Sequence, residues 1–583
     1  MIRNVWFGFI LLLTIPLCSM GQSVSDKDQK VSIRVERIPL PTYLVDPPDP
    51  NPRFYDGRAY QGAQGRVYPY PIYESLSDTR VIKDYNMVFL ENEYIKINLL
   101  PEIGGRLFGA MDKTNNYDYI YRQHVIKPGL IGMLGAWISG GIEWNFPHHH
   151  RATAFMPVNY IMQENSDESA TLWISELEIR HRMKFMLGIS VYPGKSYFEV
   201  TFRPYNGTPF TNSFLYFANT GVHSNEDYQV IFPPSTEFGV YHGKNEFVRW
   251  PFSHEEYNDV DYSEGVDISW WKNHPEWTSI FAWNYQDDFV GGYDHGKEAG
   301  LICFSNHHIA PGKKFWTWST GPRGQLWDKA LTETDGPELE IMTGGYSDNQ
   351  PDYSWLQPYE SKYLKQYWYP IRAIGSVKNA NLEAAVNLER TDSEKIKIGL
   401  NTTSLRQNAR VLVNIKGEKI FEQQIDIDPA HPFVKDIDVP KESLDTDIKI
   451  ILLSSEGNEL ISYQPVKKAE SPMPEVAKPP KSPEDIPSIE ELYYTGLRLE
   501  QFHNPSFDPY AYYEEALRRD SSDYRVNTAL GLLYLKRGIF GEAEQHLQTA
   551  VNRITSNYTK PKDGEAYYYL GLCQKLSGNT ESA

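Results

Sequence analysis

The densest group of chemically active side chains lies in the segment Ser139-Gly-Gly-Ile-Glu-Trp-Asn-Phe-Pro-His-His-His-Arg151. A carboxylate can donate or accept a proton, and indole and amide groups suit the flat face and the hydroxyls of a sugar. Three consecutive histidines cannot all point one way, so a metal site here would use two at most. The alternative is a solvated loop. We predict a catalytic role for Glu143 and substrate contacts from Trp144, Asn145, His148 and His149.

A second polar group surrounds His223, which follows an apolar, strand-like run in the segment 216–228. Histidine titrates near neutral pH, so an imidazole at a strand end is a suitable proton donor. A single histidine can equally be structural. We predict that His223 is catalytic and that Asn219 and Asn225 bind substrate.

A third group begins at Glu338-Leu-Glu-Ile-Met-Thr-Gly. Side chains alternate along a strand, so Glu338 and Glu340 would share one face while Leu339 and Ile341 take the other. Two carboxylates would then point into one cleft, with Glu340 catalytic and Glu338 binding substrate. The alternative is a solvent-facing strand edge. Further sugar contacts are predicted from the residues that follow, Asp348, Gln350 and Trp355.

These groups need a β framework to bring them together. From residue 81 to 374, strand-like alternation such as Ile95, Ile97 and Leu99 recurs between Gly, Pro, Asn and Asp turns. This pattern predicts one large antiparallel β domain, preceded at 22–80 by an extended segment that packs on it. Residues 375–466 predict a smaller, immunoglobulin-like β-sandwich. A Pro-rich linker at 467–487 follows.

Residues 488–583 change to helical periodicity and contain a repeat. Ala529-Leu-Gly531 recurs as Tyr569-Leu-Gly571, and Gly496 and Gly531 are 35 residues apart. Small residues at this spacing resemble tetratricopeptide repeats, in which paired helices pack closely. The last repeat is incomplete at Ala583, so we expect a longer array or a capping partner. The resemblance implies a protein partner for the repeats.

The first 21 residues predict a secretion signal. Arg3 precedes an apolar run, and small residues stand before Gln22. The run is too short to cross a bilayer comfortably, and no other segment is long and apolar enough. Leu17 before Cys18 is a poor lipidation context. We therefore expect an exported protein, periplasmic or extracellular, rather than an outer-membrane lipoprotein.

Composition narrows the functional classes. The chain has a formal net charge of −19 without basic clusters, which argues against a nucleic-acid partner. Beyond the signal only Cys303 and Cys573 remain, which argues against a disulfide framework or thiolate zinc site. We expect no cofactor, and nothing supports a Ca²⁺ site. With 40 Tyr and 14 Trp, the aromatic excess suits either a carbohydrate surface or a β-rich core.

Several motifs resemble a known superfamily. Asn206-Gly-Thr-Pro209 before His223, and Pro101-Glu-Ile-Gly-Gly-Arg106, resemble the galactose-mutarotase superfamily. Glu338-Leu-Glu-Ile-Met-Thr-Gly and Gln366-Tyr-Trp-Tyr-Pro370 look more closely like its bacterial domain family 5107, often followed by tetratricopeptide repeats. The resemblance covers residues 30–375. It implies a β-supersandwich with a sugar cleft on its concave face, with Arg106 at the substrate, His223 as acid and Glu340 as base.

Three functions are consistent with these residues. A glycoside hydrolase needs two carboxyl groups, for which Glu143 and Glu340 are the candidates, and export favours it. An aldose 1-epimerase would use His223 as acid and Glu340 as base. A non-catalytic glycan-binding scaffold would recruit a protein partner through its repeats. All three predict an oligo- or polysaccharide, or a simple sugar, as ligand.

Overall fold

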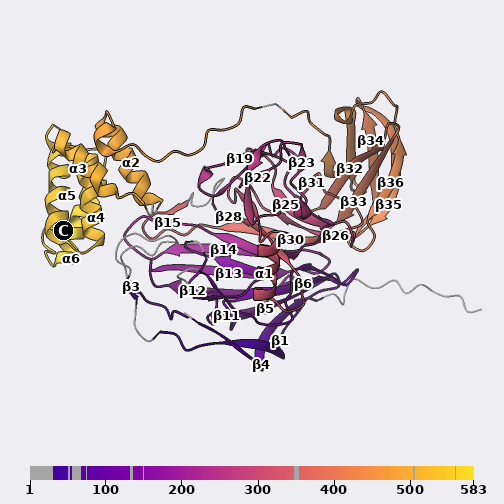
Figure 1. Cartoon of the computed structure of the whole chain (residues 1–583), viewed down its shortest axis with the longest axis horizontal. Coiled ribbons are helices and arrows are strands. Elements are labelled where there is room, and N and C mark those ends of the chain that lie inside the picture. Colours follow the sequence, from indigo (N-terminus) through magenta and orange to yellow (C-terminus); the bar gives the residue numbers. More distant parts are fainter. Residues whose placement is uncertain are drawn as a thin grey trace, which may run out of the picture.

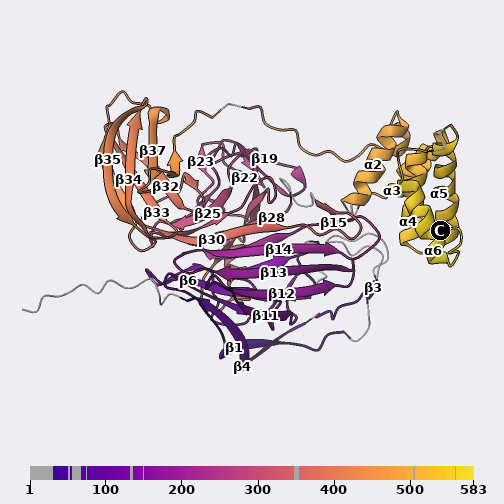
Figure 2. The ribbon, with the colours of Figure 1, turned by 180° about the vertical axis from the view of Figure 1, so that it is seen from behind.

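A computed structural model describes residues 30–49, 53–54, 67–73, 75–131, 135–148, 150–346, 354–468, 471–502, 506–557 and 560–583. A large β body occupies the middle of the molecule (Figure 1). A smaller group of strands lies at one end of the long axis and the C-terminal helices lie at the other, in both the front and the back views (Figures 1 and 2).

The first layer of the β body is a 12-stranded sheet, and it carries all three polar groups that the sequence singles out. Its strands are antiparallel neighbours throughout. In spatial order they are β1 (Ser32–Val45), β4 (Leu76–Glu91), β5 (Ile95–Leu100), β6 (Arg106–Asp112), β10 (Ile142–Asn145), β16 (Phe217–His223), β28 (Glu338–Gly344), β27 (Gly312–Thr317), β24 (Thr278–Trp283), β18 (Phe238–Val240) and β19 (Phe247–Arg249), with β7 (Tyr117–Ile120) beside β6.

The second layer is an eight-stranded sheet, which faces the viewer in Figure 2. Its order is β11 (Asn159–Glu164), β12 (Ala170–Glu178), β13 (Met183–Val191), β14 (Phe198–Asn206), β30 (Leu364–Arg372), β26 (Ala299–Phe304), β25 (Phe289–Asp294) and β17 (Tyr228–Ile231). Alternate side chains of both sheets, among them Leu339, Ile341 and Leu187, form one buried core. Each such side chain contributes roughly 1.5–3 kcal/mol by leaving water. This shared core packs the site-bearing strands against the second layer.

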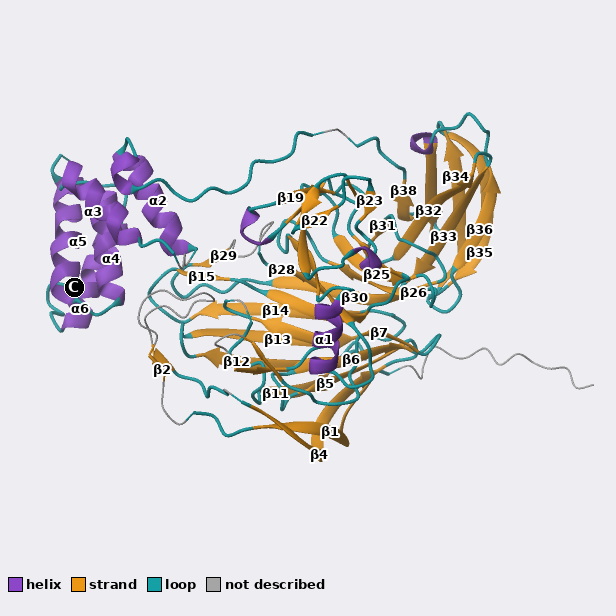
Figure 3. Ribbon diagram, viewed as in Figure 1, coloured by secondary structure: helices purple, strands orange, loops and turns teal. Residues whose placement is uncertain are grey.

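Short strands and one helix complete the body. The strand pairs are β2 (Arg53–Phe54) with β3 (Val67–Tyr68), β8 (Gly129–Ile131) with β9 (Gly135–Trp137), β15 (Asn212–Phe214) with β29 (Ser354–Leu356), β20 (Phe252–Ser253) with β23 (Val266–Asp267), and β21 (Glu256–Tyr257) with β22 (Val260–Asp261). Helix α1 (Pro322–Leu331) lies near the middle of Figure 3. It begins with proline at its first position, where no N–H is needed.

The N-terminal segment differs from the expectation. Residues 22–80 were predicted to pack over the β domain, but β1 is an edge strand of its 12-stranded sheet, and the expected boundary at residue 80 falls inside β4. Pro39 and Pro41 lie within β1. Proline lacks the N–H that an inner strand would use, so it is tolerated on an edge strand.

A second β unit follows, with two four-stranded antiparallel sheets. One contains β31 (Asn379–Ala380), β32 (Ala384–Asp392), β33 (Lys395–Thr402) and β36 (Phe433–Asp438), and the other β35 (Glu418–Ile427), β34 (Arg406–Ile415), β37 (Ile448–Leu453) and β38 (Glu459–Tyr463). They share a core of their own, which includes Ile398, Val413 and Ile450.

The C-terminal region is helical. It contains α2 (Ile489–Gln501), α3 (Pro509–Arg519), α4 (Tyr524–Lys536), α5 (Phe540–Thr555) and α6 (Glu565–Ser577). A Cβ atom on Gly496 would lie 2.6 Å from the Tyr513 ring, and one on Gly531 would lie 2.7 Å from Leu547. These glycines therefore permit the close helix packing that the repeat pattern predicts. The expected mainly β fold with a helical C-terminal region is confirmed.

The linker between the second β unit and the C-terminal helices contacts the large β body. The Lys468 ammonium donates to the Thr236 carbonyl at 2.8 Å, the Ser471 hydroxyl donates to Glu237 at 3.1 Å, and the Ala477 N–H donates to the Lys244 carbonyl at 2.7 Å. Among the described residues, no helix is long and apolar enough to cross a membrane. The predicted signal at 1–21 lies outside the described residues.

Candidate functional site

Strand register brings the predicted carboxylates to one face of the 12-stranded sheet, the face turned away from the second layer. Leu339 and Ile341 enter the core, so Glu338 and Glu340 take the outer face as the alternation predicts. Glu338 lies opposite His223 on β16, and Glu340 lies opposite Gly221 on β16 and Trp316 on β27. Glu143 is opposite Asn219, on the far side of β16.

Arg106 lies at the centre of this group. It is 3% exposed, its Nη1 donates to the Gly140 carbonyl, and its Nη2 is 4.0 Å from the Glu143 carboxylate. The charges of Glu143, Glu338 and Glu340 all favour its ionised form, while burial lowers the pKa of Arg106. A buried guanidinium among three carboxyl groups can stabilise the negative charge of a carboxylate that water does not reach.

Glu143 is the ionised member of the group. Its Oε2 accepts hydrogen bonds from the Trp137 indole at 3.1 Å and from the His150 imidazole at 2.9 Å. Burial opposes ionisation, but His150 and then Arg106 outweigh burial and hold the pKa of Glu143 at about 2. These contacts fix the orientation of the carboxylate and make it a weak base.

Glu338 and Glu340 shift the other way. Burial, followed by the charge of Glu340, raises the pKa of Glu338. Burial also raises the pKa of Glu340, against the opposing effects of His150, Lys314 and Asn219. Neither oxygen of Glu338 forms a regular hydrogen bond among the described residues, although Arg106, Ser139 and Gly140 favour its ionised form. A carboxyl group whose pKa is raised can stay protonated near neutral pH and is then available to donate a proton.

Beside this group, β24, β27 and the turn at His242 form a chain of polar contacts. The Ser279 hydroxyl and His242 Nδ1 are 2.5 Å apart, and His242 Nε2 lies 3.2 Å from the Lys314 ammonium. Burial lowers the pKa of Lys314, and the nearby Glu340 opposes that effect. This series of polar contacts therefore ends near Glu340 and places the Lys314 amine beside that carboxyl group.

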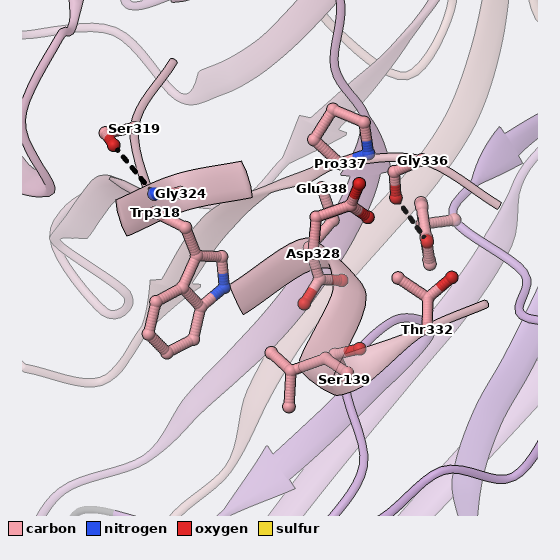
Figure 4. Close-up of a pocket in the computed structure, with 11 residues that line it drawn as sticks. Ser139, Trp318, Ser319, Gly324, Asp328, Thr332, Gly336, Pro337 and Glu338 are labelled. Carbon is pink, nitrogen blue, oxygen red and sulfur yellow. Dashed lines mark hydrogen bonds between the residues drawn. The ribbon is translucent and has the colours of Figure 1, made fainter. Parts of the chain in front are cut away.

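A narrow pocket opens at Glu338 (Figure 4). Its walls come from β28 and α1, with the Glu338 and Asp328 carboxyl groups on the same pocket and the Trp318 indole beside them. Burial raises the pKa of Asp328 from its ordinary value of 3.8. The full lining is Tyr121, Ser139, Trp318, Ser319, Gly324, Asp328, Leu331, Thr332, Gly336, Pro337 and Glu338.

Two glycines make this pocket possible. A Cβ on Gly221 would lie 2.7 Å from Glu338 Oε2, so the carboxyl group leans across β16 where no side chain stands. A Cβ on Gly324 would lie 2.0 Å from the Ser319 carbonyl oxygen, so α1 approaches the preceding loop as closely as backbone allows. The Ser319 hydroxyl accepts the Gly324 N–H at 3.2 Å (Figure 4).

His223 is half-buried at the end of β16. Its ring packs against Tyr121 with centroids 4.2 Å apart and the two planes tilted by 40°, and Tyr121 in turn lines the pocket and donates to the Gly336 carbonyl at 2.7 Å. Burial lowers the pKa of His223, against the charges of Asp118 and Asp335. His223 therefore lies next to the pocket, with Tyr121 between them. Its lowered pKa leaves the imidazole neutral at neutral pH.

Several predicted contacts lie elsewhere. Trp144 is 1% exposed in the core and donates to the Gly105 carbonyl, because neighbours of Glu143 on a strand point to the opposite face. Asn145 accepts the Arg151 N–H at 2.9 Å and supports the loop. Trp144 and Asn145 thus lie apart from the carboxyl group of Glu143 in this structure, and their predicted contacts with substrate stay predictions.

The remaining predicted contacts are also structural or lie outside the described residues. His148 is buried against His181, with ring nitrogens 3.1 Å apart. Asn225 donates to Asp294 at 2.7 Å in a turn, and Trp355 packs on Phe502, which directly follows α2. None of these three lines the pocket described above. His149, Asp348 and Gln350 lie outside the described residues.

Two residues of the second wall, Trp318 and Asp328, are absent from the predicted site. They come from the loop after β27 and from α1, between the second and the third polar group in the sequence. The spacing Trp316-Thr-Trp318 was an available signal, since residues two apart in an extended segment share a face. Among the residues that the structure describes, no group of three or more His, Cys, Asp or Glu side chains is placed to hold a metal ion.

Fold and site together define a protein class: a two-layer β body with a buried acidic group on its outer sheet face, a small β-sandwich and helical repeats. The model of the family described as "Domain of unknown function (DUF5107)" matches residues 63–371, more than half of the chain. The chain belongs to this family. The model "YphG-like protein, second domain" matches residues 379–463, the second β unit.

Solved structures resemble the chain at the level of fold. A TPR-domain containing protein from Parabacteroides distasonis has 17% identity and a TM-score of 0.52, over 95% of this chain and 87% of that one. A galactose mutarotase-like protein from Clostridium acetobutylicum has 11% identity and a TM-score of 0.37, over 50% and 96%. A putative aldose 1-epimerase from Klebsiella pneumoniae has 9% identity and a TM-score of 0.36, over 49% and 79%.

Proposed function

We propose that the protein is a glycoside hydrolase that acts on a carbohydrate bound at the pocket between β28 and α1. The observation that carries this proposal is Glu338: a buried carboxyl group with a raised pKa that lines a narrow pocket and forms no regular hydrogen bond among the described residues. A neutral acid at neutral pH is what protonation of a glycosidic oxygen requires.

The second carboxyl group of the reaction is Asp328. It lines the same pocket from α1, opposite the strand that carries Glu338. Glu338 donates its proton to the leaving oxygen, and the Asp328 carboxylate either activates water or attacks the anomeric carbon. Glu143 and Arg106 act as positioning residues, because Glu143 is held by two hydrogen bonds and has a pKa of about 2. This pairing replaces the pair Glu143 and Glu340 that the sequence suggested.

Release of reducing ends from a panel of defined oligo- and polysaccharides tests the proposal. Glu338→Gln and Asp328→Asn should each lower kcat/KM by about 10²–10⁴-fold, the usual loss when a general acid or base is removed. Glu333→Gln is the matched control, since Glu333 is nearby but bonds to Tyr43 and Arg80 rather than lining the pocket. Full activity in either pocket variant, with both folded, would contradict the assignment.

An aldose 1-epimerase is the second candidate, and one observation favours it: His223 lies directly opposite Glu338 in the sheet register. The roles would then be the reverse of those implied by the resemblance, because His223 is neutral and Glu338 is protonated. Polarimetry on freshly dissolved glucose and galactose distinguishes the two. Faster mutarotation that is lost in His223→Gln, without release of reducing ends, would replace the hydrolase by the epimerase.

Location and partners complete the proposal. The signal-like residues 1–21 support export to the periplasm or beyond, where polymeric glycans are available. The helical repeats support a protein partner at the end of the molecule distant from the small β-sandwich.

A further inference from the structure

Four indole rings form a continuous row on the outer side of the β body. Neighbouring centroids are 5.4 Å apart from Trp277 to Trp316, 5.7 Å from Trp316 to Trp318, and 4.9 Å from Trp318 to Trp327. The rings come from the segment before β24, from β27 and the loop after it, and from α1. Chain segments distant in sequence thus converge to build one aromatic surface.

The row lies at the surface, although Trp316 also packs against a buried cluster that includes Phe281 and Met342. The two end members are substantially exposed, Trp277 at 39% and Trp327 at 42%, and the two inner members are half-buried. Exposed apolar area costs roughly 25 cal/mol per Å² relative to burial, so packing alone would not favour two indoles here. A contiguous aromatic patch on a folded surface marks a site of interaction.

The chemistry of the row matches a sugar chain. Its borders are polar: Arg323 and Glu276 approach to 3.9 Å, and Arg323 shares a helix face with Trp327, four residues on. The Trp318 indole N–H has no hydrogen-bond partner among the described residues, and it is buried at the pocket. Flat apolar faces with donors and carboxylates at the rim fit the C–H face and hydroxyl edge of a pyranose.

The position of the row relates it to the reaction. Trp318 lines the pocket with Glu338, while Trp316 lies opposite Glu340 in the register. Trp277 and Trp327 therefore extend in both directions from the acid. A monosaccharide would occupy only the centre of such a surface.

We infer that this tryptophan row, Trp277, Trp316, Trp318 and Trp327, is an extended glycan-binding surface and that the substrate is an oligo- or polysaccharide chain laid across the pocket. The inference rests on the proposed function for the place of cleavage, but binding by the row can be measured without cleavage. Each tryptophan at an end of the row stacks on one sugar unit that lies away from Glu338.

The test measures binding in the inactive variant Glu338→Gln by the change in tryptophan fluorescence. The probes are disaccharides and the corresponding hexasaccharides of gluco-, manno-, galacto- and xylo-configuration. For the configuration that binds, the hexasaccharide should bind at least about tenfold more tightly than the disaccharide, as expected when one added stacking contact is worth roughly 1.4 kcal/mol.

End-of-row variants then locate the effect. Trp277→Ala and Trp327→Ala should each weaken hexasaccharide binding about tenfold and leave disaccharide binding unchanged. Tyr160→Ala is the matched control, with an aromatic ring 38% exposed on β11 of the other sheet, and should change neither. Unchanged melting temperatures show that each variant is folded.

The outcomes separate the two proposals. Binding that is independent of chain length, or hexasaccharide binding unaffected by both end variants, overturns the inference about the row even if the wild type hydrolyses glycans. Length-dependent binding that both end variants weaken, in a wild type that releases no reducing ends, supports the row and overturns the hydrolase. Absence of binding by every probe overturns the inference.

Discussion

At the scale of single residues, the distinguishing feature is that the pKa values of three neighbouring glutamates move in opposite directions, down for Glu143 and up for Glu338 and Glu340. Glu143 is ionised because an imidazole and an indole hydrogen-bond it, and Arg106 is near. Glu338 is protonated because it is buried and Glu340 is close. Carboxyl groups whose environments push their pKa values apart are those to which different chemical roles can be assigned.

The first residue-scale prediction concerns Glu340→Gln. The charge of Glu340 raises the pKa of Glu338, so its removal should lower that pKa. The protonated form of Glu338 is then lost at a lower pH, and the alkaline limb of kcat/KM against pH should shift to more acidic values. A pH–rate profile from pH 4 to 10 measures it. A lower rate with an unshifted limb would mean that Glu340 only supports the structure.

At the scale of elements, the site depends on two glycines, because a residue without a side chain lets its neighbours approach closely. Strand β16 passes between Glu143 and Glu338 with Gly221 at the crossing, and α1 meets its loop at Gly324. These two close approaches set the two walls of the pocket. The strand and the helix are therefore part of the site through their backbones.

Gly221→Val tests this point. The added side chain would meet Glu338 Oε2 at 2.7 Å and the Gly140 Cα at 2.9 Å, so it displaces the acid. We expect a loss of about 1–3 kcal/mol in the free energy of unfolding, typical of overpacking, and activity near that of Glu338→Gln. Gly541→Ala on α5, with nothing within 4 Å of the added Cβ, is the control and should not lose stability. Urea unfolding measures the stability of both variants, and the reducing-end assay measures their activity. Wild-type activity in Gly221→Val would show that Glu338 does not need the space beside Gly221.

Alternation along strands explains how far the sequence could predict these elements. It correctly separated Glu338 and Glu340 from Leu339 and Ile341. The same rule, applied to β10, would have assigned Glu143 and Trp144 to opposite faces. The place of Asp328 beside Glu338 could not be predicted, because it depends on how α1 packs in the folded chain, and a local period does not report such a contact.

At the scale of the whole molecule, the helical region is docked against the β body. Trp355 contacts Phe502, the residue that follows α2, with ring centroids 5.6 Å apart, and the Tyr568 hydroxyl of α6 donates to the Pro209 carbonyl at 2.9 Å. Phe210 packs into the core of the helices. With the contacts of Lys468, Ser471 and Ala477, these interactions hold the repeats in a defined position.

Phe502→Ala should loosen this docking. One aromatic contact is worth about 0.5–1.5 kcal/mol, which is enough to populate undocked arrangements. Small-angle X-ray scattering should then give a larger radius of gyration than the wild type, with an unchanged circular dichroism spectrum. Tyr494→Ala on α2, 56% exposed, is the control. An unchanged radius of gyration would mean that the remaining contacts suffice.

The buried, protonated state of Glu338 also ties the formation of this fold to the proton concentration. In the unfolded chain its carboxyl group has the ordinary pKa of 4.5, and in the folded protein that pKa is higher. Between these two values the group is charged when unfolded and neutral when folded, so each molecule takes up a proton at this group as it folds. The associated stabilisation is complete below pH 4.5 and is lost as the pH rises through the folded value. By mass action, acidification within this window drives the same carboxyl group both to enter its pocket and to carry the proton that it would donate in the proposed reaction.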